Sequence, residues 1–347
     1  MDADFYNALF SYNQSADEPL FLLQGITVSD KVNNGAENAY DGKLLEMLIE
    51  DGKKAVDIIH GRKSILIGRR GESGRYRKDI SQWVIGLVVG NTWSADTIAY
   101  TDHSSLHQGG YQGTYFSSAS EAGAFETMLA QIMDKIASYE MEKYGEQRPI
   151  GFANSPEHDF LRYQEEYALQ LKKYSYLDAV HILAGTEWKA GTFAAYRLFD
   201  YCDGFSGYLE PEQNEDLAGI LDTLDKESSY GGYLELLANY HSMPVLALGY
   251  GCSTARGAVS QDNAPITEEE QGERLMEVYR DAKRFGWSGV CISSWQDRWE
   301  QKSWNTAYAV NSENRVYWHD LQTEGASYGL LAFSPGESEQ TVRIDGI

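Results

Sequence analysis

The sequence is poor in cysteine, and it has no long apolar run. Its three cysteines, Cys202, Cys252 and Cys291, form no C-x-x-C pair. An odd number at this spacing argues against both a disulfide framework and a zinc site. No stretch approaches the length of a membrane span, and no signal peptide is recognisable. We therefore expect no metal, no cofactor and no membrane contact from this segment. The protein is expected to be either cytoplasmic or a domain excised from a larger surface protein.

Positive charge is also scarce, because 29 lysines and arginines face 52 aspartates and glutamates and leave a net charge of −23. Such a surface repels phosphate backbones, which excludes nucleic acid as an expected partner. Aromatic residues are abundant instead, at 13% of the chain with 24 tyrosines and 8 tryptophans. Tyrosine and tryptophan stack on sugar rings and on bases, although many such residues simply fill a core. Neither the net charge nor the aromatic content indicates a particular oligomeric state.

Eight short apolar runs alternate with helical patterns along most of the chain, which predicts buried parallel strands. The runs are residues 20–25, 64–67, 83–90, 148–154, 177–183, a segment within 192–205, a run from Val245, and 289–293. This count predicts an α/β fold of the (β/α)8 TIM barrel type over residues 1–310. Residues 311–347 are expected to form a short C-terminal β segment that either begins a β-sandwich or packs on the barrel.

Helical periodicity covers residues 42–59 and 125–144, and a capping box at residues 267–270 opens a further helix. Residues 68–78 form a basic, glycine-rich segment. It lacks the Gly-Lys-Ser/Thr ending of a phosphate-binding P-loop, and we expect a loop on the active face. The spacing of Asp102, His103 and His107 matches no metal motif, and a solvated loop is expected there.

The functional face should lie at the carboxyl ends of the strands, where parallel α/β folds place their ligands. The seventh and eighth runs end in Gly249 and Tyr250 and in Trp295, Gln296 and Asp297. These positions are therefore predicted to face a pocket.

Several motifs in the last third of the chain are similar to bacterial (β/α)8 domains of the clan A glycoside hydrolases. In such domains the seventh strand reads Met-Pro-Val-Leu-Val-Ala-Glu-Phe-Gly, and Ser-Arg-Gly, Glu-Glu-Glu-Gln-Gly-Glu, Trp-Gln-Asp-x-Trp and Lys-x-Trp-Asn-Thr motifs follow. The matching segments here are residues 243–246, 255–257, 268–273, 295–299 and 302–306. The resemblance is dense from about residue 230 to 333 and looser over residues 20–154. It implies a carbohydrate-binding face and an oligosaccharide or polysaccharide as partner.

The catalytic positions of the family depart from its pattern. Retaining glycosidases need one carboxylate as nucleophile and a second as acid. The resemblance places the nucleophile at Gly249, which has no side chain, and the acid at Ser155 or, in another alignment, at Thr92. The best-placed alternative carboxylates are Glu187 and Asp297. The sequence alone does not show whether Gly249 is natural or engineered.

Aromatic and amide side chains near predicted strand ends are the candidates for sugar binding. They are Gln24, Trp93, Asn154, Trp188, Tyr250, Trp295, Gln296, Trp299 and Trp304.

Three functions remain open from the sequence. The first is a glycoside hydrolase-like barrel that binds a glycan with weak or no hydrolysis. The second is an active glycosidase or transglycosidase that uses Glu187 and Asp297. The third is a non-catalytic protein-interaction scaffold.

Overall fold

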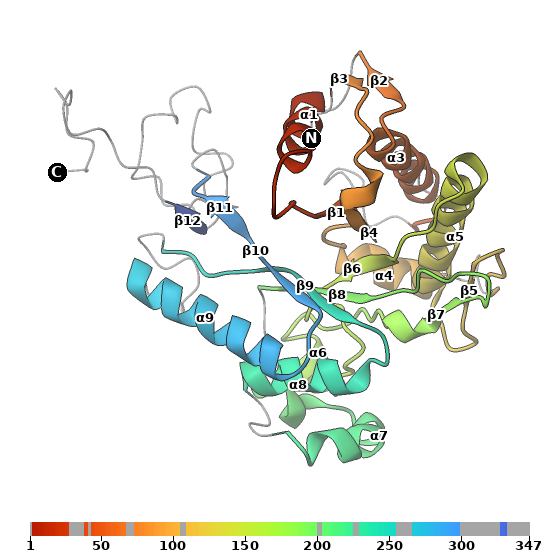
Figure 1. Ribbon diagram of the computed structural model, residues 1–347. Coiled ribbons are helices and arrows are strands. Elements are labelled where there is room, and N and C mark those ends of the chain that lie inside the picture. The colour runs from red at the N-terminus through yellow and green to blue at the C-terminus, as the bar shows by residue number, and fades with distance from the viewer. Residues whose placement is uncertain are drawn as a thin grey trace, which may run out of the picture.

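The computed structural model describes residues 2–27, 38–40, 43–66, 73–104, 109–199, 203–224, 229–254, 266–298 and 327–331. Its centre is a curled, six-stranded parallel sheet, which helices cover on one face (Figure 1). The strands, in the spatial order of the sheet, are β1 (Leu22–Ile26), β4 (Val84–Val89), β6 (Ile150–Asn154), β8 (Ala194–Leu198), β9 (Val245–Tyr250) and β10 (Gly289–Ile292).

The sequence predicted a closed barrel of eight strands. Within the described residues, the sheet is instead an open half-barrel of six strands. Six of the eight predicted runs join the sheet. The second run forms β2 (Lys63–Ile65), which pairs antiparallel with β3 (Gly74–Tyr76). The fifth forms β7 (Ile182–Ala184), antiparallel to β5 (Phe116–Ser118). Short apolar runs do not reveal their pairing partners, and Leu66 beside β2 is 90% exposed rather than buried.

Helices complete the fold and lie where the periodicity of the sequence predicts several of them. The long helices are α3 (Leu44–Ile59), α5 (Ala124–Tyr144) and α9 (Glu268–Arg284). The shorter helices are α1 (Ala3–Asn13), α4 (Ala95–Asp102), α6 (Glu165–Ala168), α7 (Pro211–Leu221) and α8 (Tyr230–Tyr240). Single 3₁₀ turns are η1 (Ser81–Trp83), η2 (Ala179–His181) and η3 (Phe205–Tyr208).

Two of these helices begin and end at residues whose chemistry explains the boundary. Thr267 caps α9 and forms the predicted capping box with Glu270, in which each side chain accepts the other's backbone N–H. Gly145 ends α5 with φ 71°, a left-handed conformation that costs glycine little.

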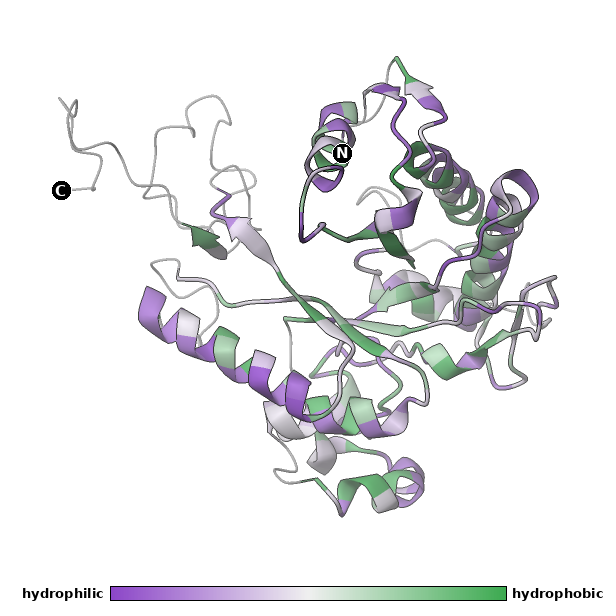
Figure 2. Cartoon of the chain, in the orientation of Figure 1, coloured by the Kyte–Doolittle hydropathy of each residue, from purple (hydrophilic) through white to green (hydrophobic). Residues whose placement is uncertain are grey.

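The two faces of the sheet bury different side chains. The outer face packs against the helices and belongs to the main core, with Leu87, Phe152, Tyr196 and Ala247 among its members. The inner face is defined by a second, smaller cluster of Val88, Ala153, Phe193 and Ala195, with Leu23, Leu246 and Leu248 packed around it. Figure 2 shows the strands as mostly hydrophobic and α9 as largely hydrophilic along its length.

Past β10 the chain continues into β11 (Ser294–Gln296), which pairs in parallel with β12 (Gly329–Leu331). The predicted division into residues 1–310 and 311–347 falls largely outside the described residues and stays a prediction. No helix in the described ranges combines the length and the apolar character that a bilayer crossing requires.

Candidate functional site

The carboxyl end of the sheet is the candidate site, and its inner face has almost no charge. The six strands contain no aspartate and no glutamate, and their one charged residue is Arg197 of β8. Glycine and alanine dominate this face. Gly86 and Gly151 lie against the Phe193 ring so closely that a Cβ atom at either position would approach its ring carbons to about 3 Å.

Gly249 lies on the inner face near the end of β9. The register shifts there, so that Tyr196 pairs with Ala247 and Arg197 pairs with Gly249. A Cβ atom at Gly249 would lie 3.3 Å from two carbons of the Phe199 ring. A side chain at this position therefore points along the inner face toward Phe199, and only a small movement of that ring is needed to admit one.

An aromatic and cationic stack lies beside Gly249. The Arg197 guanidinium lies 5.2 Å from the centroid of the Phe199 ring, within the range of a cation–π contact. Phe199 meets Tyr328 edge to face, with 5.9 Å between the ring centroids. The sequence offered a signal for this stack, because Arg197 and Phe199 alternate at the end of a strand and so share a face.

The expected acid positions carry no carboxylate in the structure either. Ser155 follows β6, its backbone N–H donates to Asn154 Oδ1 at 2.8 Å, and its buried hydroxyl has no hydrogen-bond partner among the described residues. Asn154 donates to the Leu177 carbonyl at 2.8 Å and is itself buried. Thr92 follows β4 and is exposed.

Glu187 and Asp297 lie at opposite ends of the sheet. The Glu187 carbonyl accepts a hydrogen bond from Gln147, which precedes β6 and therefore marks the amino end. Asp297 follows β11 beyond the carboxyl end, where its Oδ1 accepts the Gly329 N–H at 3.0 Å and braces the pairing of β11 with β12. Burial raises the pKa of Asp297 above its usual value. The structure does not bring the two carboxylates together.

Trp93 and Trp188 are both buried, at 3% and 5% exposure. The Trp93 indole donates to the Ala153 carbonyl at 2.6 Å and packs edge to face on Phe125. Trp188 packs on Phe116 at 5.3 Å between ring centroids. Both rings support the core, so neither offers a face to a sugar.

The other candidates divide between exposed and internal positions. Trp295 is 72% exposed on β11, and Gln296 beside it is exposed too. The Gln24 side chain accepts the Tyr6 hydroxyl at 2.7 Å and so faces α1. Trp299 and Trp304 lie outside the described residues.

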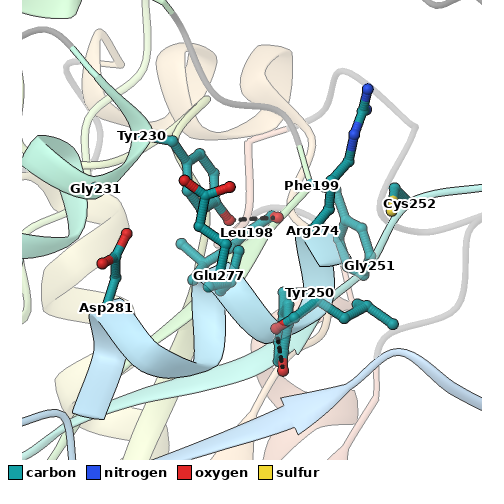
Figure 3. A pocket seen from close by; sticks show the side chains of 12 residues that line it. Leu198, Phe199, Tyr230, Gly231, Tyr250, Gly251, Cys252, Arg274, Glu277 and Asp281 are labelled. Atoms are coloured by element: carbon teal, nitrogen blue, oxygen red, sulfur yellow. Dashed lines mark hydrogen bonds between the residues drawn. The ribbon is translucent and has the colours of Figure 1, made fainter. Parts of the chain in front are cut away.

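A cavity of about 360 Å³ flanks the site on the helix side, between α8, α9 and the ends of β8 and β9 (Figure 3). Tyr250 lines it and donates to the Leu275 carbonyl at 3.3 Å, while Tyr230 donates to the Leu198 carbonyl at 3.1 Å. Phe199 lines the same cavity, which places the cavity next to the inner-face stack. Tyr250 lines this helix-side cavity from the outer face of β9, and its predicted part in sugar binding stays a prediction.

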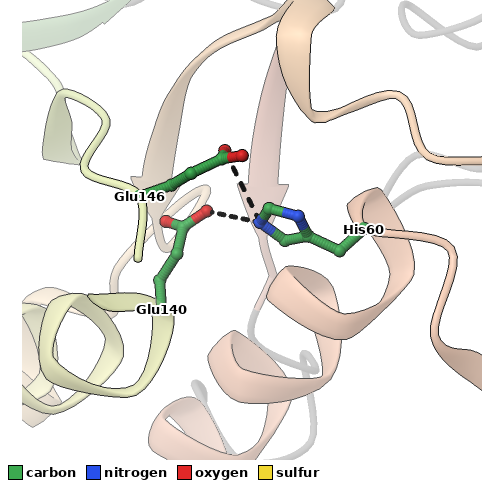
Figure 4. Close-up of side chains that lie close together, drawn as sticks. All are labelled: His60, Glu140 and Glu146. Carbon is green, nitrogen blue, oxygen red and sulfur yellow. Dashed lines mark hydrogen bonds and ion pairs between the residues drawn. The ribbon is translucent and has the colours of Figure 1, made fainter. Parts of the chain in front are cut away.

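A cluster with metal-ligand chemistry lies at the amino end of the sheet, formed by His60, Glu140 and Glu146 (Figure 4). Its ligand atoms lie within 4.8 Å of one another. The Arg148 guanidinium donates to Glu140 Oε1 at 2.7 Å and to Glu146 Oε2 at 3.0 Å. Because the Arg148 guanidinium already pairs with both carboxylates, the cluster has the character of a structural ion-pair network.

The sequence predicted a solvated loop at Asp102, but the structure places this residue in a helix. It is the last residue of α4, and its Oδ1 accepts the Phe125 N–H at 2.8 Å at the start of α5. Burial is the main cause that raises its pKa to about 6.

No family model and no curated protein matches the chain. Solved structures that are similar to it include a β-glucuronidase from an uncultured Clostridium sp., with 11% identity over 94% of this chain and a TM-score of 0.45. The β-D-glucuronidase of Dictyoglomus thermophilum and a β-glucuronidase of Ruminococcus gnavus each show 12% identity over 84% of this chain, with TM-scores of 0.39 and 0.37. The chain spans only 33% to 39% of the length of these three proteins.

Proposed function

We propose that this chain is a carbohydrate-binding domain with a glycoside hydrolase-like half-barrel and no hydrolytic activity of its own. The observation that carries the proposal is the absence of any carboxylate from the six strands of the sheet, together with glycine at the position of the nucleophile. The motifs of the last third of the sequence, which resemble clan A glycoside hydrolases, support a sugar as the ligand.

The missing hydrolysis follows from the chemistry of glycosidic bond cleavage. One carboxylate must attack or activate water, and a second must protonate the leaving oxygen. Gly249 supplies neither group, and the Ser155 hydroxyl is too weak an acid for the second task. Asp297 Oδ1 accepts a hydrogen bond from the Gly329 N–H, and Glu187 lies at the other end of the sheet.

Binding does not depend on the missing groups, because stacking and hydrogen bonding act away from the bond that is cut. Trp295 presents a largely exposed indole at the carboxyl end, and Gln296, the next residue of β11, is exposed too. An exposed indole face suits the apolar face of a pyranose ring.

Titration calorimetry tests the proposal. The probes are hexasaccharides of glucose, xylose, mannose, N-acetylglucosamine and galacturonic acid. We expect at least one to bind, and we expect Trp295→Ala to weaken that binding about tenfold, a loss of about 1.4 kcal/mol. Tyr12→Ala is the matched control, because Tyr12 is a 51% exposed aromatic on α1. Its affinity should equal that of the wild type.

Failure of every hexasaccharide to bind would overturn the proposal and leave the protein-interaction scaffold as the alternative. Equal losses in the two variants would remove Trp295 from the binding surface.

A further inference from the structure

A second polar cavity, of about 410 Å³, lies at the amino end of the sheet, away from the site described above. It is lined by His60, Gly61, Arg62, Lys63, Ser64, Tyr76, Arg77 and Asp79.

The hydrogen bonds around this cavity establish its position. His60 is the C-terminal cap of α3, and the Ile80 N–H donates to the Ile59 carbonyl at 2.8 Å. Arg148 donates to the carbonyls of Ser81 and Val84, where β4 begins. Gly249 lies near the other end of the parallel sheet, so a ligand in this cavity does not reach the inner-face site.

The lining of the cavity is cationic in a strongly acidic protein. It contains Arg62, Lys63 and Arg77 against the single carboxylate of Asp79. Seven of the 29 lysines and arginines of the chain fall within residues 62–78, with one acidic residue among them. A chain with a net charge of −23 repels anions overall. Such a local concentration of cations is therefore the feature expected of a specific anion site.

Arg62 and Arg77 do not stabilise the fold through contacts of their guanidinium groups with other described residues. Both are exposed, and neither side chain forms an ion pair or a hydrogen bond within the described part of the chain. Lys63 lies 3.8 Å from Asp57, but Lys143 already binds that carboxylate at 2.7 Å. Lys63 is thus only loosely held.

The remaining groups of the cavity do not oppose an anion strongly. Asp79 accepts the Ser81 N–H at 3.0 Å through one oxygen, and its other oxygen lies 4.0 Å from His60 Nδ1. The last carbonyls of α3 also face this end, and backbone N–H groups of His60, Gly61 and Arg62 satisfy three of them.

We propose that this cavity binds a small molecule that carries a phosphate or sulfate ester. The guanidinium groups of Arg62 and Arg77 match the oxygens of a tetrahedral anion in a forked geometry. Lys63 adds a third charge, and the Ser64 hydroxyl adds a donor. A volume of about 410 Å³ holds more than a bare anion and lies within the usual range for small-molecule sites.

Calorimetry at low ionic strength with inorganic phosphate, pyrophosphate and sulfate tests this site. We expect one of the anions to bind to the wild-type protein, and the comparison of phosphate with sulfate separates the two ester classes. Arg62→Gln and Arg77→Gln should each weaken binding at least tenfold. Arg75→Gln is the matched control, because Arg75 lies on the same hairpin and does not line the cavity. It should weaken binding no more than twofold.

Two results would overturn the inference. The first is the absence of binding by all three anions. The second is an equal loss in Arg75→Gln and Arg77→Gln, which would indicate diffuse charge rather than a site. Thermal unfolding of each variant should match the wild type, because the substituted side chains are exposed. Anion binding should also persist in Trp295→Ala, which keeps this inference separate from the proposed saccharide site.

Discussion

The two faces of the central sheet differ sharply in where they place acidic groups. The buried carboxylates among the described residues belong to helices or loops on the outer side, and the described part of the inner face has none. The buried acids are Asp57, Glu126, Asp134, Glu140, Asp159 and Asp178.

Each buried acid on the outer side has a structural partner. Asp159 pairs with Lys173, Glu126 pairs with His181, and Glu140 pairs with Arg148. An abundance of acidic residues is therefore no measure of catalytic capacity in this protein. Carboxylates brace the helices, whereas the described part of the inner face has glycine, alanine, larger apolar side chains and the cation of Arg197, and no carboxylate.

The largest expected effect comes from giving the inner face a carboxylate. Gly249→Glu supplies a nucleophile without an acid, so we expect cleavage only of 2,4-dinitrophenyl glycosides, whose leaving group needs no proton. Because removal of a nucleophile costs about 10⁶ in rate, restoring one should raise the rate at least about 100-fold. Release of dinitrophenolate measures the rate.

The control for this variant is Gly272→Glu, which adds the same side chain to α9 where no atom lies within 4 Å. It should stay inactive. Adding Ser155→Glu to Gly249→Glu should extend cleavage to substrates with poor leaving groups. A folded Gly249→Glu protein that binds saccharide but never cleaves the activated glycosides would show that residue 249 does not face the bond.

The second prediction concerns the outer side of the sheet, where removing one partner of a buried ion pair should destabilise the fold. Lys173 donates to Asp159 Oδ1 at 2.5 Å and to the Pro156 carbonyl at 2.9 Å, and both side chains of the pair are almost fully buried. Lys173→Met leaves a buried carboxylate without its cation, which should lower the free energy of unfolding by about 3–5 kcal/mol. Urea unfolding followed by tryptophan fluorescence measures the loss.

The neighbouring Lys172 is exposed, and Lys172→Met should change that free energy by less than about 0.5 kcal/mol. Equal effects of the two substitutions would contradict the structural role of the pair.

A smaller effect, which depends on pH, is expected at Asp102. The pKa of about 6 in the folded state exceeds the ordinary aspartate value of 3.8, so the folded state binds more protons between these pH values. The contribution of Asp102 to stability therefore falls as the pH rises from about 4 to 6. Asp102→Asn should match the wild type near pH 4 and exceed its free energy of unfolding by at most about 3 kcal/mol at pH 7.

Unfolding at pH 4 and pH 7 measures this difference. Asp17→Asn, at an exposed position, should show no such dependence. If Asp102→Asn were less stable than the wild type at pH 7, the charged form of Asp102 would instead be stabilising.

The sequence predicted most of the strands of the sheet, but it also predicted a closed barrel, whereas the described strands form an open half-barrel. Apolar runs located β1, β4, β6, β8, β9 and β10, and the Thr267 capping box located the start of α9. The prediction that residues 64–67 form a strand of the central sheet was wrong, because an apolar run has the same pattern in a parallel sheet and in a hairpin.

The candidate site was harder to predict, because residues that follow a strand, or that lie at a register shift, do not keep the strand's alternation of faces. Trp93 follows a strand as expected, yet its indole turns back to the Ala153 carbonyl. Asp297 follows β11 but binds a backbone amide. The family resemblance drew attention to Gly249, whereas its approach to Phe199 depends on a register shift that the sequence does not reveal.

The most direct test incubates the purified wild-type protein with whichever hexasaccharide it binds and measures new reducing ends over several days. We predict that the heat of binding is present and that no reducing ends accumulate above the buffer blank. Reducing ends that accumulate with the wild type and disappear with Asp297→Asn would show that a working catalytic carboxylate exists, and would contradict the central claim.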